Sequence, residues 1–297
     1  MRWRQFVMDL GTLDAARVER LFARHGAEAV TFTDGGAEAV LEPARGETPL
    51  WRDTRITGLF AADTDFASLR RELRSALGVA QLPRHRIEDL AERAWEREWL
   101  RDFHAMRCGR RLWVCPAGQR PADTDAVILA LDPGLAFGTG SHATTALCLE
   151  WLDGAALAGR RVLDFGCGSG ILAIAALLLG AHSAHAIDRD PQALDATRRN
   201  AERNGVAARL TCGSAPAGGN FDVAVANILA QPLIEHAGWL CECIRDDGWL
   251  VLSGILGTQA DSVHAAYRDR IDFTPPAARD EWVRLAGRKI ARHGHGT

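Results

Sequence analysis

No stretch of this 297-residue sequence is apolar for long enough to span a membrane. The longest apolar run, from Ile171 to Gly180, supplies about half of the roughly 20 residues that a spanning helix needs. The first residues, Met1 to Phe6, lack the apolar core of a signal peptide. We therefore expect a cytoplasmic protein without a membrane partner.

The sequence also lacks an excess of positive charge. It has 35 Lys and Arg residues against 38 Asp and Glu residues, which gives a formal net charge of −3. Proteins that hold nucleic acid mainly through phosphate contacts usually present a strongly basic surface. No block of like charges forms a basic tail. We expect no direct sequence-specific binding of nucleic acid.

The cysteines lack the spacing of a disulfide framework, and their number, seven, is odd. Cys241 and Cys243 form a close pair, but there is no second pair to complete a zinc site. We interpret them as small residues in a helix. No metal site is predicted, and the thiols are expected to be reduced.

The first 90 residues alternate short strand and helix patterns and contain no recognisable catalytic group. The pattern predicts a small α+β domain of the ferredoxin-like type, with a function in recognition. A charged, tryptophan-containing helix follows, and we assign residues 91–110 to a linker. The predicted strands are Trp3–Met8, Glu28–Thr33, Thr54–Phe60 and Arg84–Leu90, and the predicted helices are Asp14–His25 and Phe66–Leu77.

Residues 111–297 are assigned to a second domain, in which strands alternate regularly with helices. This pattern indicates an α/β fold with a parallel sheet covered on both faces. Glu281 to Ala286 is expected to close the sheet as an edge strand. The other predicted strands are Leu112–Cys115, Ala126–Leu131, Arg161–Phe165, Ala184–Asp188, Arg209–Cys212, Phe221–Asn227 and Trp249–Ser253.

A glycine-rich turn, Gly166-Cys167-Gly168-Ser169-Gly170, follows the strand that ends at Phe165. Such a turn commonly binds a nucleotide-like ligand at the carboxyl end of a parallel sheet. Asp164 just before it would repel a pyrophosphate but would suit a ligand with ammonium or sulfonium charge. Asp188 ends the next strand, where an acid can accept both ribose hydroxyls. The pattern favours S-adenosylmethionine over a dinucleotide or a purely structural turn.

Two further segments point to the same edge of the sheet. The glycine-dense run from Leu131 to Thr145 has the composition of a lid, and Thr144 and Thr145 could cap the helix that follows. Asn227 ends the fourth strand and is followed by Ile228-Leu229-Ala230, so no aromatic residue is present to stack on a planar substrate. The sequence therefore favours an aliphatic amine as the methyl acceptor.

Several of these segments together resemble the family of bacterial ribosomal protein L-eleven (L11) methyltransferases, the ribosomal protein methyltransferase A family. The resemblance covers essentially the whole chain. It rests on Leu131–Leu149, Asp164–Ala173, Asn227–Ala230, Ser253–Leu256 and Glu281-Trp282.

This resemblance implies a class I, Rossmann-like methyltransferase domain behind a ferredoxin-like substrate-recognition domain. It implies transfer of methyl groups from S-adenosylmethionine to lysine ε-amino groups and the N-terminal α-amino group of L11, free or on the large subunit. Separately from the resemblance, we expect a monomer, although the sequence leaves the oligomeric state open. From its place at the tip of a strand, we expect Asn227 to be the catalytic residue that orients the amine. The cofactor-binding residues would be Asp164, Gly168 and the family positions Thr145, Gly166, Asp188 and Asn227, with Phe137, Gly138 and His142 in the lid.

The sequence departs from the family pattern in two places. In the lid, Ser141 and Ala143 stand where the family commonly has Thr and Pro, and Ala117-Gly118 stands where a tryptophan is frequent. Two other functions stay open at this point. One is a class I methyltransferase that acts on RNA or a small molecule, and the other is a non-catalytic ribosome assembly factor. The modified amines and the number of methyl groups are also open.

Overall fold

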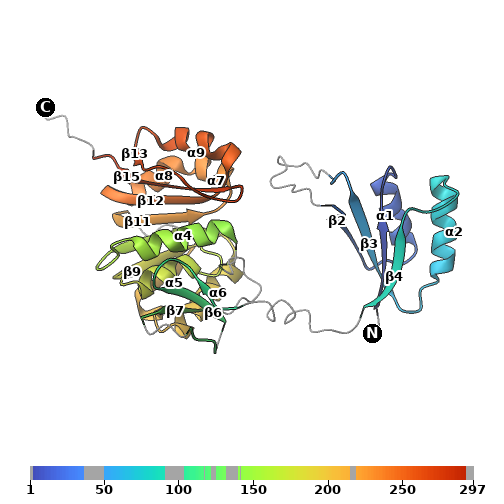
Figure 1. Cartoon of the computed structure of the whole chain (residues 1–297), viewed down its shortest axis with the longest axis horizontal. Helices are drawn as coiled ribbons and strands as arrows, with labels where there is room; N and C mark the ends of the chain where they lie inside the picture. The colour runs from blue at the N-terminus through green and yellow to red at the C-terminus, as the bar shows by residue number, and fades with distance from the viewer. Residues whose placement is uncertain are drawn as a thin grey trace. The chain divides into compact units, whose positions relative to one another are not determined.

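The computed structural model describes residues 3–36, 50–90, 104–116, 118–121, 125–131, 140, 142–214 and 219–291. The chain divides into two units, residues 1–94 and 95–297 (Figure 1). Each unit has its own hydrophobic core and is described by itself.

The first unit is a four-stranded antiparallel sheet with two helices packed against one face (Figure 1). The sheet order is β2-β3-β1-β4, and every neighbouring pair is antiparallel. This is the β-α-β-β-α-β connectivity of the ferredoxin-like unit. Its elements are β1 (Trp3–Asp9), α1 (Ala15–Arg24), β2 (Ala29–Asp34), β3 (Thr54–Ala61), α2 (Phe66–Leu77) and β4 (His85–Leu90).

Phenylalanine rings fill the space between this sheet and its helices. The ring of Phe22 in α1 lies 5.5 Å from that of Phe6 and 5.6 Å from that of Phe60, edge to face in both cases. Gly58 in β3 permits this packing, because a Cβ atom there would lie 2.6 Å from ring carbons of both Phe22 and Phe60. The packing of this unit therefore requires a glycine inside a strand, where no turn calls for one.

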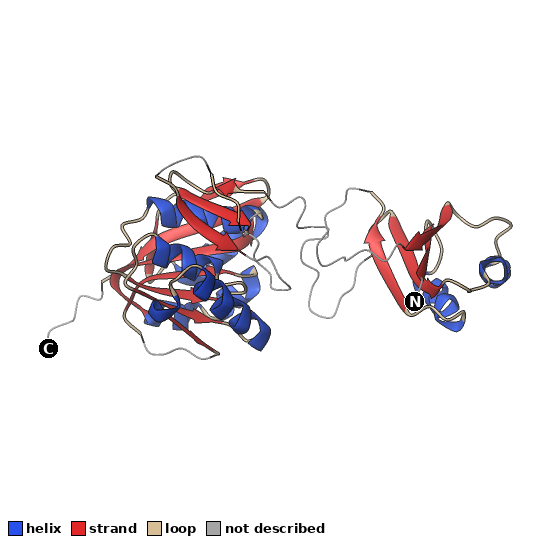
Figure 2. Ribbon diagram, turned by 90° about the horizontal axis from the view of Figure 1, so that it is seen from below, coloured by secondary structure: helices blue, strands red, loops and turns tan. Residues whose placement is uncertain are grey.

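The second unit is built on an eight-stranded mixed sheet with helices on both faces (Figures 1 and 2). The strand order is β10-β9-β8-β11-β12-β15-β13, and β14 pairs with β15. The strands from β10 to β12 are parallel, whereas β15 is antiparallel to β12, β13 and β14. These strands are β8 (Arg161–Phe165), β9 (Ser183–Ile187), β10 (Leu210–Gly213), β11 (Phe221–Asn227), β12 (Ile244–Leu256), β13 (Ile271–Phe273), β14 (Ala277–Arg279) and β15 (Trp282–Lys289).

Two hydrophobic cores lie on opposite faces of this sheet. Helices α4 and α5 supply much of the first core. Helices α7, α8 and α9 supply much of the second core, which includes the buried residues Cys241 and Cys243. The helices are α4 (Ala143–Gly154), α5 (Ile171–Leu178), α6 (Pro191–Arg203), α7 (Ala230–Glu235), α8 (Ala237–Cys243) and α9 (Ala260–Tyr267), with short 3-10 turns η2 (Ala207–Arg209) and η3 (Gly257–Gln259).

A separate three-stranded sheet packs beside this core. It has the order β5-β6-β7 and consists of β5 (Met106–Arg107), β6 (Leu112–Pro116) and β7 (Val127–Leu131). Leu112, Val114, Leu129 and Leu131 turn into the first core, where they meet α4 and α5. In the part of the chain that the structure describes, no helix is both long and apolar enough to cross a membrane.

The structure corrects two expectations about this unit. The segment expected at the edge of the sheet, β15, lies inside it between β12 and β13, so the sheet is mixed and not wholly parallel. The end of the predicted linker also differs, since Met106 and Arg107 pair with β6 as a strand. Residues 91–103, where the linker helix was predicted, lie outside the described residues.

Candidate functional site

The carboxyl ends of four parallel strands meet at one edge of the large sheet. Phe165 at the end of β8 pairs with Ile187 of β9 and with Ala226 of β11. Asn227 of β11 in turn pairs with Ser253 of β12. The register therefore brings the ends of these strands and the residues that follow them to a common edge, which is where open α/β sheets bind ligands.

The glycine-rich turn after β8 lies across the ends of β8 and β9. Gly166 and Gly170 have φ of 77° and 78°, in the left-handed region that favours glycine. The backbone N–H groups of Gly166 and Cys167 donate to the carbonyl of Ile187 at 2.8 and 2.9 Å. The turn is therefore fixed to the neighbouring strand before it opens into α5.

Asp188 lies beside this turn and is held by two backbone donors. Its Oδ2 accepts from the N–H of Gly168 at 2.9 Å, and its Oδ1 accepts from the N–H of Asp190 at 3.0 Å. The residue is half-buried. A carboxylate oxygen has lone pairs left after one such bond, so the group can still accept hydroxyl donors from a ligand.

Asp164 lies beneath the turn and is fully buried. Its Oδ2 accepts from the N–H of Ala173 at 3.0 Å, and its Oδ1 has no partner among the described residues. Burial raises the pKa of the Asp164 carboxyl to about 7; the Ala173 hydrogen bond opposes the shift and the charge of Asp188 adds to it. One oxygen of this carboxyl therefore supports the start of α5, and the other is left without a partner among the described residues.

Asn227 ends β11 and is held by the first turn of α4. Its Nδ2 donates to the hydroxyl of Thr145 at 3.1 Å. The hydroxyl of Ser253 donates to the carbonyl of Thr144 at 3.0 Å, which ties the end of β12 to the same turn of helix. Because Nδ2 is engaged, the Oδ1 atom of Asn227 is the acceptor that this side chain can offer to a substrate.

The residue after Asn227 is clamped between two glycines. A Cβ atom at Gly166 would lie 2.3 Å from Cγ2 of Ile228, and one at Gly254 would lie 2.3 Å from the Ile228 carbonyl oxygen. Gly254 has a φ of 82°. This clamp fixes the backbone that presents Asn227. Sequence reasoning quoted Gly254 only as part of a family segment and gave it no function.

His142 of the lid region is the N-cap of α4. Its Nδ1 lies 2.7 Å from the Thr144 hydroxyl and accepts from the Thr144 N–H at 3.4 Å, and its ring lies 5.0 Å from that of Trp282. The cap is therefore His142 and not Thr144 or Thr145, which are buried within the first turn. The lid residues Phe137 and Gly138 lie outside the described residues.

The site therefore combines two carboxylates, a rigid glycine turn and an amide at adjacent strand ends. The unpartnered Oδ1 of buried Asp164 and the negative charge of Asp188 fit a ligand that brings hydrogen-bond donors and positive charge. S-adenosylmethionine meets both requirements, because its ribose hydroxyls and ammonium group are donors and its ammonium and sulfonium groups are positively charged. A pyrophosphate does not.

This sheet and its site are those of a class I S-adenosylmethionine-dependent methyltransferase. The family model described as "Ribosomal protein L11 methyltransferase (PrmA)" matches residues 2–290. The chain belongs to this family.

Named relatives agree with that assignment. Enzymes named ribosomal protein L11 methyltransferase from Pseudomonas aeruginosa and Edwardsiella ictaluri are each 50% identical to this chain, and the matches cover 98% and 97% of it and 100% and 99% of those proteins. A solved structure of a ribosomal protein L11 methylase from Lactobacillus delbrueckii subsp. bulgaricus matches with a TM-score of 0.60 at 33% identity. That match covers 64% of this chain and all of the solved chain.

Proposed function

We propose that this chain transfers methyl groups from S-adenosylmethionine to amines of ribosomal protein L11, namely lysine ε-amino groups and the N-terminal α-amino group. The observation that carries the proposal is the Asn227–Thr145 pair at the ligand-binding edge of the sheet. The pair presents the Oδ1 atom of Asn227 beside the glycine turn. No aromatic ring directly follows Asn227 to stack on a planar substrate, so the site suits an aliphatic amine.

When bound, S-adenosylmethionine supplies an electrophilic methyl group on a sulfonium. Asp188 would hold its ribose hydroxyls, the turn at Gly166 and Gly168 would lie against it, and Thr145 and the lid residues would complete the contacts. The cationic end of S-adenosylmethionine would favour the ionised form of the buried Asp164 carboxyl.

Asn227 would position the methyl acceptor. With Nδ2 fixed by Thr145, Oδ1 would accept an N–H of the substrate amine and leave the nitrogen lone pair free for attack. The amine must first lose a proton, which at a pKa of about 10.4 costs roughly 4–5 kcal/mol at pH 7. Desolvation in the closed site favours the neutral amine, so the proton passes to water and no dedicated base is needed.

The two units would divide the work between them. We assign residues 1–90 to substrate recognition, the residues from 91 to the strand at Met106 to a linker, and the rest of the chain to catalysis. In support of this, Asp164, Asp188 and Asn227 all lie in the second unit. The first unit has a cavity of about 480 Å³ beside α2, lined by Arg70, Arg71 and Arg74 among others.

We further propose that the enzyme works as a cytoplasmic monomer without sequence-specific nucleic acid binding. Ribosomal proteins are assembled in the cytoplasm, and the net charge of −3 does not favour RNA as the main partner.

Methyl transfer from labelled S-adenosylmethionine to purified L11, to ribosomal RNA and to a mixture of small metabolites tests the function. We expect label in L11 alone, on lysines and the N-terminal amine. Label in RNA or in a metabolite would select the alternative methyltransferase function, and no transfer at all would select the assembly factor.

A further inference from the structure

β7 has one unpaired edge. In the order β5-β6-β7 it pairs with β6 on one side and ends the sheet on the other. The N–H of Val127 donates to the carbonyl of Arg111 at 2.8 Å, so the backbone groups of Val127 face β6. Because successive residues of a strand direct these groups to opposite sides, those of Ile128 and Ala130 face away from the sheet.

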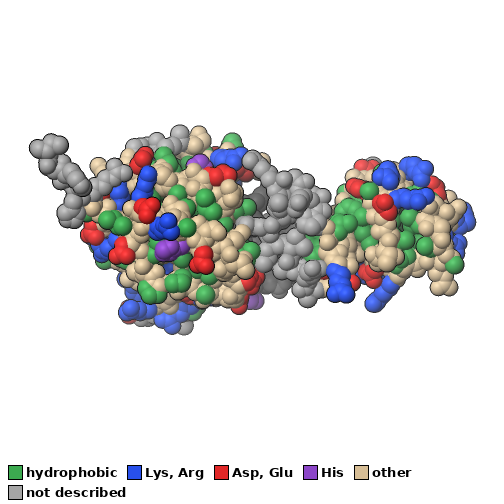
Figure 3. Space-filling view, turned by 90° about the horizontal axis from the view of Figure 1, so that it is seen from above, with side chains coloured by type: hydrophobic (Ala, Val, Ile, Leu, Met, Phe, Trp, Pro, Cys, Tyr) green, Lys and Arg blue, Asp and Glu red, His purple; other side chains and the backbone are tan. Residues whose placement is uncertain are grey.

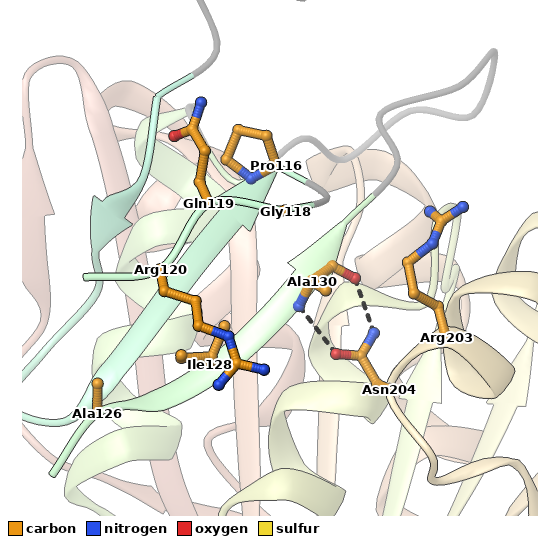
Figure 4. A pocket seen from close by; sticks show the side chains of 9 residues that line it. All are labelled: Pro116, Gly118, Gln119, Arg120, Ala126, Ile128, Ala130, Arg203 and Asn204. Atoms are coloured by element: carbon orange, nitrogen blue, oxygen red, sulfur yellow. Dashed lines mark hydrogen bonds between the residues drawn. The ribbon is translucent and has the colours of Figure 1, made fainter. Parts of the chain in front are cut away.

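An asparagine side chain already pairs with one of these two outward-facing residues. Asn204, the C-cap of α6, accepts from the N–H of Ala130 and donates to its carbonyl, both at 2.8 Å (Figure 4). A second bond from the same Nδ2 to the carbonyl of Asn200 fixes the side chain. The amide of Asn204 therefore pairs with Ala130 as the backbone of an added strand would.

The next outward position, Ile128, faces a cavity. Its N–H and carbonyl have no partner among the described residues, and the cavity beside it measures about 360 Å³ (Figure 4). Arg120 also lines this cavity, and its guanidinium has no acidic partner in the described part of the chain. An open strand edge of this kind is a template for a further strand.

We propose that the free edge of β7 at Ile128 binds an extended segment of the protein substrate by strand addition, with a carboxylate side chain of that segment on Arg120. The inference rests on the proposed function, since it adds a docking point for the same substrate. A donor and an acceptor side by side on a strand match a peptide backbone. The phosphates of RNA offer only acceptors.

The edge is linked to the glycine turn through the end of α6. Nδ2 of Asn204 donates to the carbonyl of Asn200 at 2.8 Å, and Nδ2 of Asn200 donates to the carbonyl of Ser169 in the turn at 2.9 Å. A segment bound at Ile128 would therefore lie on the unit that carries the candidate site, and another part of the same substrate would supply the target amine.

Amide hydrogen exchange of the full-length protein tests the inference directly. On addition of purified L11 we expect exchange at the Ile128 N–H to slow by about tenfold or more, while Ala130, already bonded to Asn204, changes little. If L11 is methylated but Ile128 exchanges as before, the inference is wrong and the proposed function stands. If L11 is neither methylated nor bound, both fail.

Substitutions separate the backbone from the side chain. Ile128→Pro removes an N–H that β6 does not use, so the strand pairing is retained. We expect it to raise the KM for L11 roughly five- to tenfold, whereas Ile128→Ala, which keeps the N–H, should change it less than twofold. Equal effects of the two would overturn the inference. Should Ile128→Pro unfold, the exchange measurement on the wild type decides.

Substitution tests the charge of Arg120, and hydrogen exchange tests the identity of the bound segment. Arg120→Glu should raise the KM for L11, and the control Arg110→Glu, an exposed arginine outside the cavity, should not. Neither should alter binding of S-adenosylmethionine. Slower exchange at Ile128 caused by higher enzyme concentration alone would identify a second copy of the chain as the occupant. Slower exchange caused by an RNA oligonucleotide would identify RNA, and either result would overturn the inference.

Discussion

At the residue scale, Asp164 carries the main electrostatic cost of the candidate site. Burial raises its pKa from 3.8 to about 7. Between these two values the unfolded chain has lost the proton and the folded chain retains it. Stability therefore falls as pH rises from about 4 to 7. The difference corresponds to on the order of 4 kcal/mol at 1.36 kcal/mol per pH unit.

Asp164→Asn removes this titration. We expect the melting temperature of the variant, measured without ligand, to exceed that of the wild type increasingly as pH rises from 4 to 8. Binding of S-adenosylmethionine to the wild type near pH 7 should release protons, because a cationic ligand favours the ionised carboxyl. Calorimetry in buffers of different ionisation enthalpy measures that release. A difference in melting temperature that does not vary with pH would show that Asp164 is already ionised.

A second prediction at this scale concerns Asn227. If its Oδ1 orients the amine, Asn227→Ala should lower kcat on the order of 100-fold while the dissociation constant of S-adenosylmethionine changes little. Gln231→Ala, an exposed amide on α7, is the matched control and should be nearly neutral. Steady-state kinetics with L11 and calorimetry give the two numbers. Equal losses in binding and turnover would make Asn227 a cofactor ligand only.

At the scale of elements, the sequence predicts which segments form strands better than it predicts how they pair. Arg161–Phe165 and Phe221–Asn227 match the observed β8 and β11. The position of β15 was missed because an apolar alternation shows that a strand is buried but does not identify its neighbours. β12 begins earlier than expected, since Ile244 pairs with Phe221 before a register shift.

The candidate site shows the same limit. Chemically distinctive residues, such as Asp188 and Asn227, could be selected from their place after a strand. The contacts that fix the positions of these side chains could not be predicted. The Asn227–Thr145 hydrogen bond joins residues 82 positions apart, and the glycine clamp on Ile228 brings together residues at the ends of three separate strands. The cap was assigned to threonine from average preference, whereas packing against Trp282 places His142 there.

The glycine clamp gives a prediction at this scale. Gly254→Ala puts a Cβ atom into the carbonyl of Ile228 at a φ of 82°, so we expect a loss of about 2 kcal/mol or more in stability and a large loss of activity. Gly257→Ala is the control, because its nearest neighbour would be 3.7 Å away. Denaturant unfolding and methyl transfer measure both variants. Near-wild-type activity of Gly254→Ala would show that the clamp does not set the position of Asn227.

At the scale of the whole molecule, the division of labour between the two units can be tested by truncation. The second unit contains both core clusters of the large sheet and all the described site residues, so a protein that begins near residue 95 should fold. It should bind S-adenosylmethionine with an affinity within about threefold of the full chain. The first unit has its own phenylalanine core, so it should fold separately as well.

Methylation of L11 by the truncated enzyme should nevertheless fall by on the order of 100-fold in kcat/KM, because recognition is lost while the site remains. The loss should appear mainly in KM, since the contacts removed are made equally before and during methyl transfer. Adding the separate first unit in trans should not restore activity at micromolar concentration, because the connection between the units supplies a high effective concentration. A truncated enzyme that methylates L11 at the full-length rate would place recognition in the catalytic unit itself. The cavity beside β7 would then be the first surface to examine.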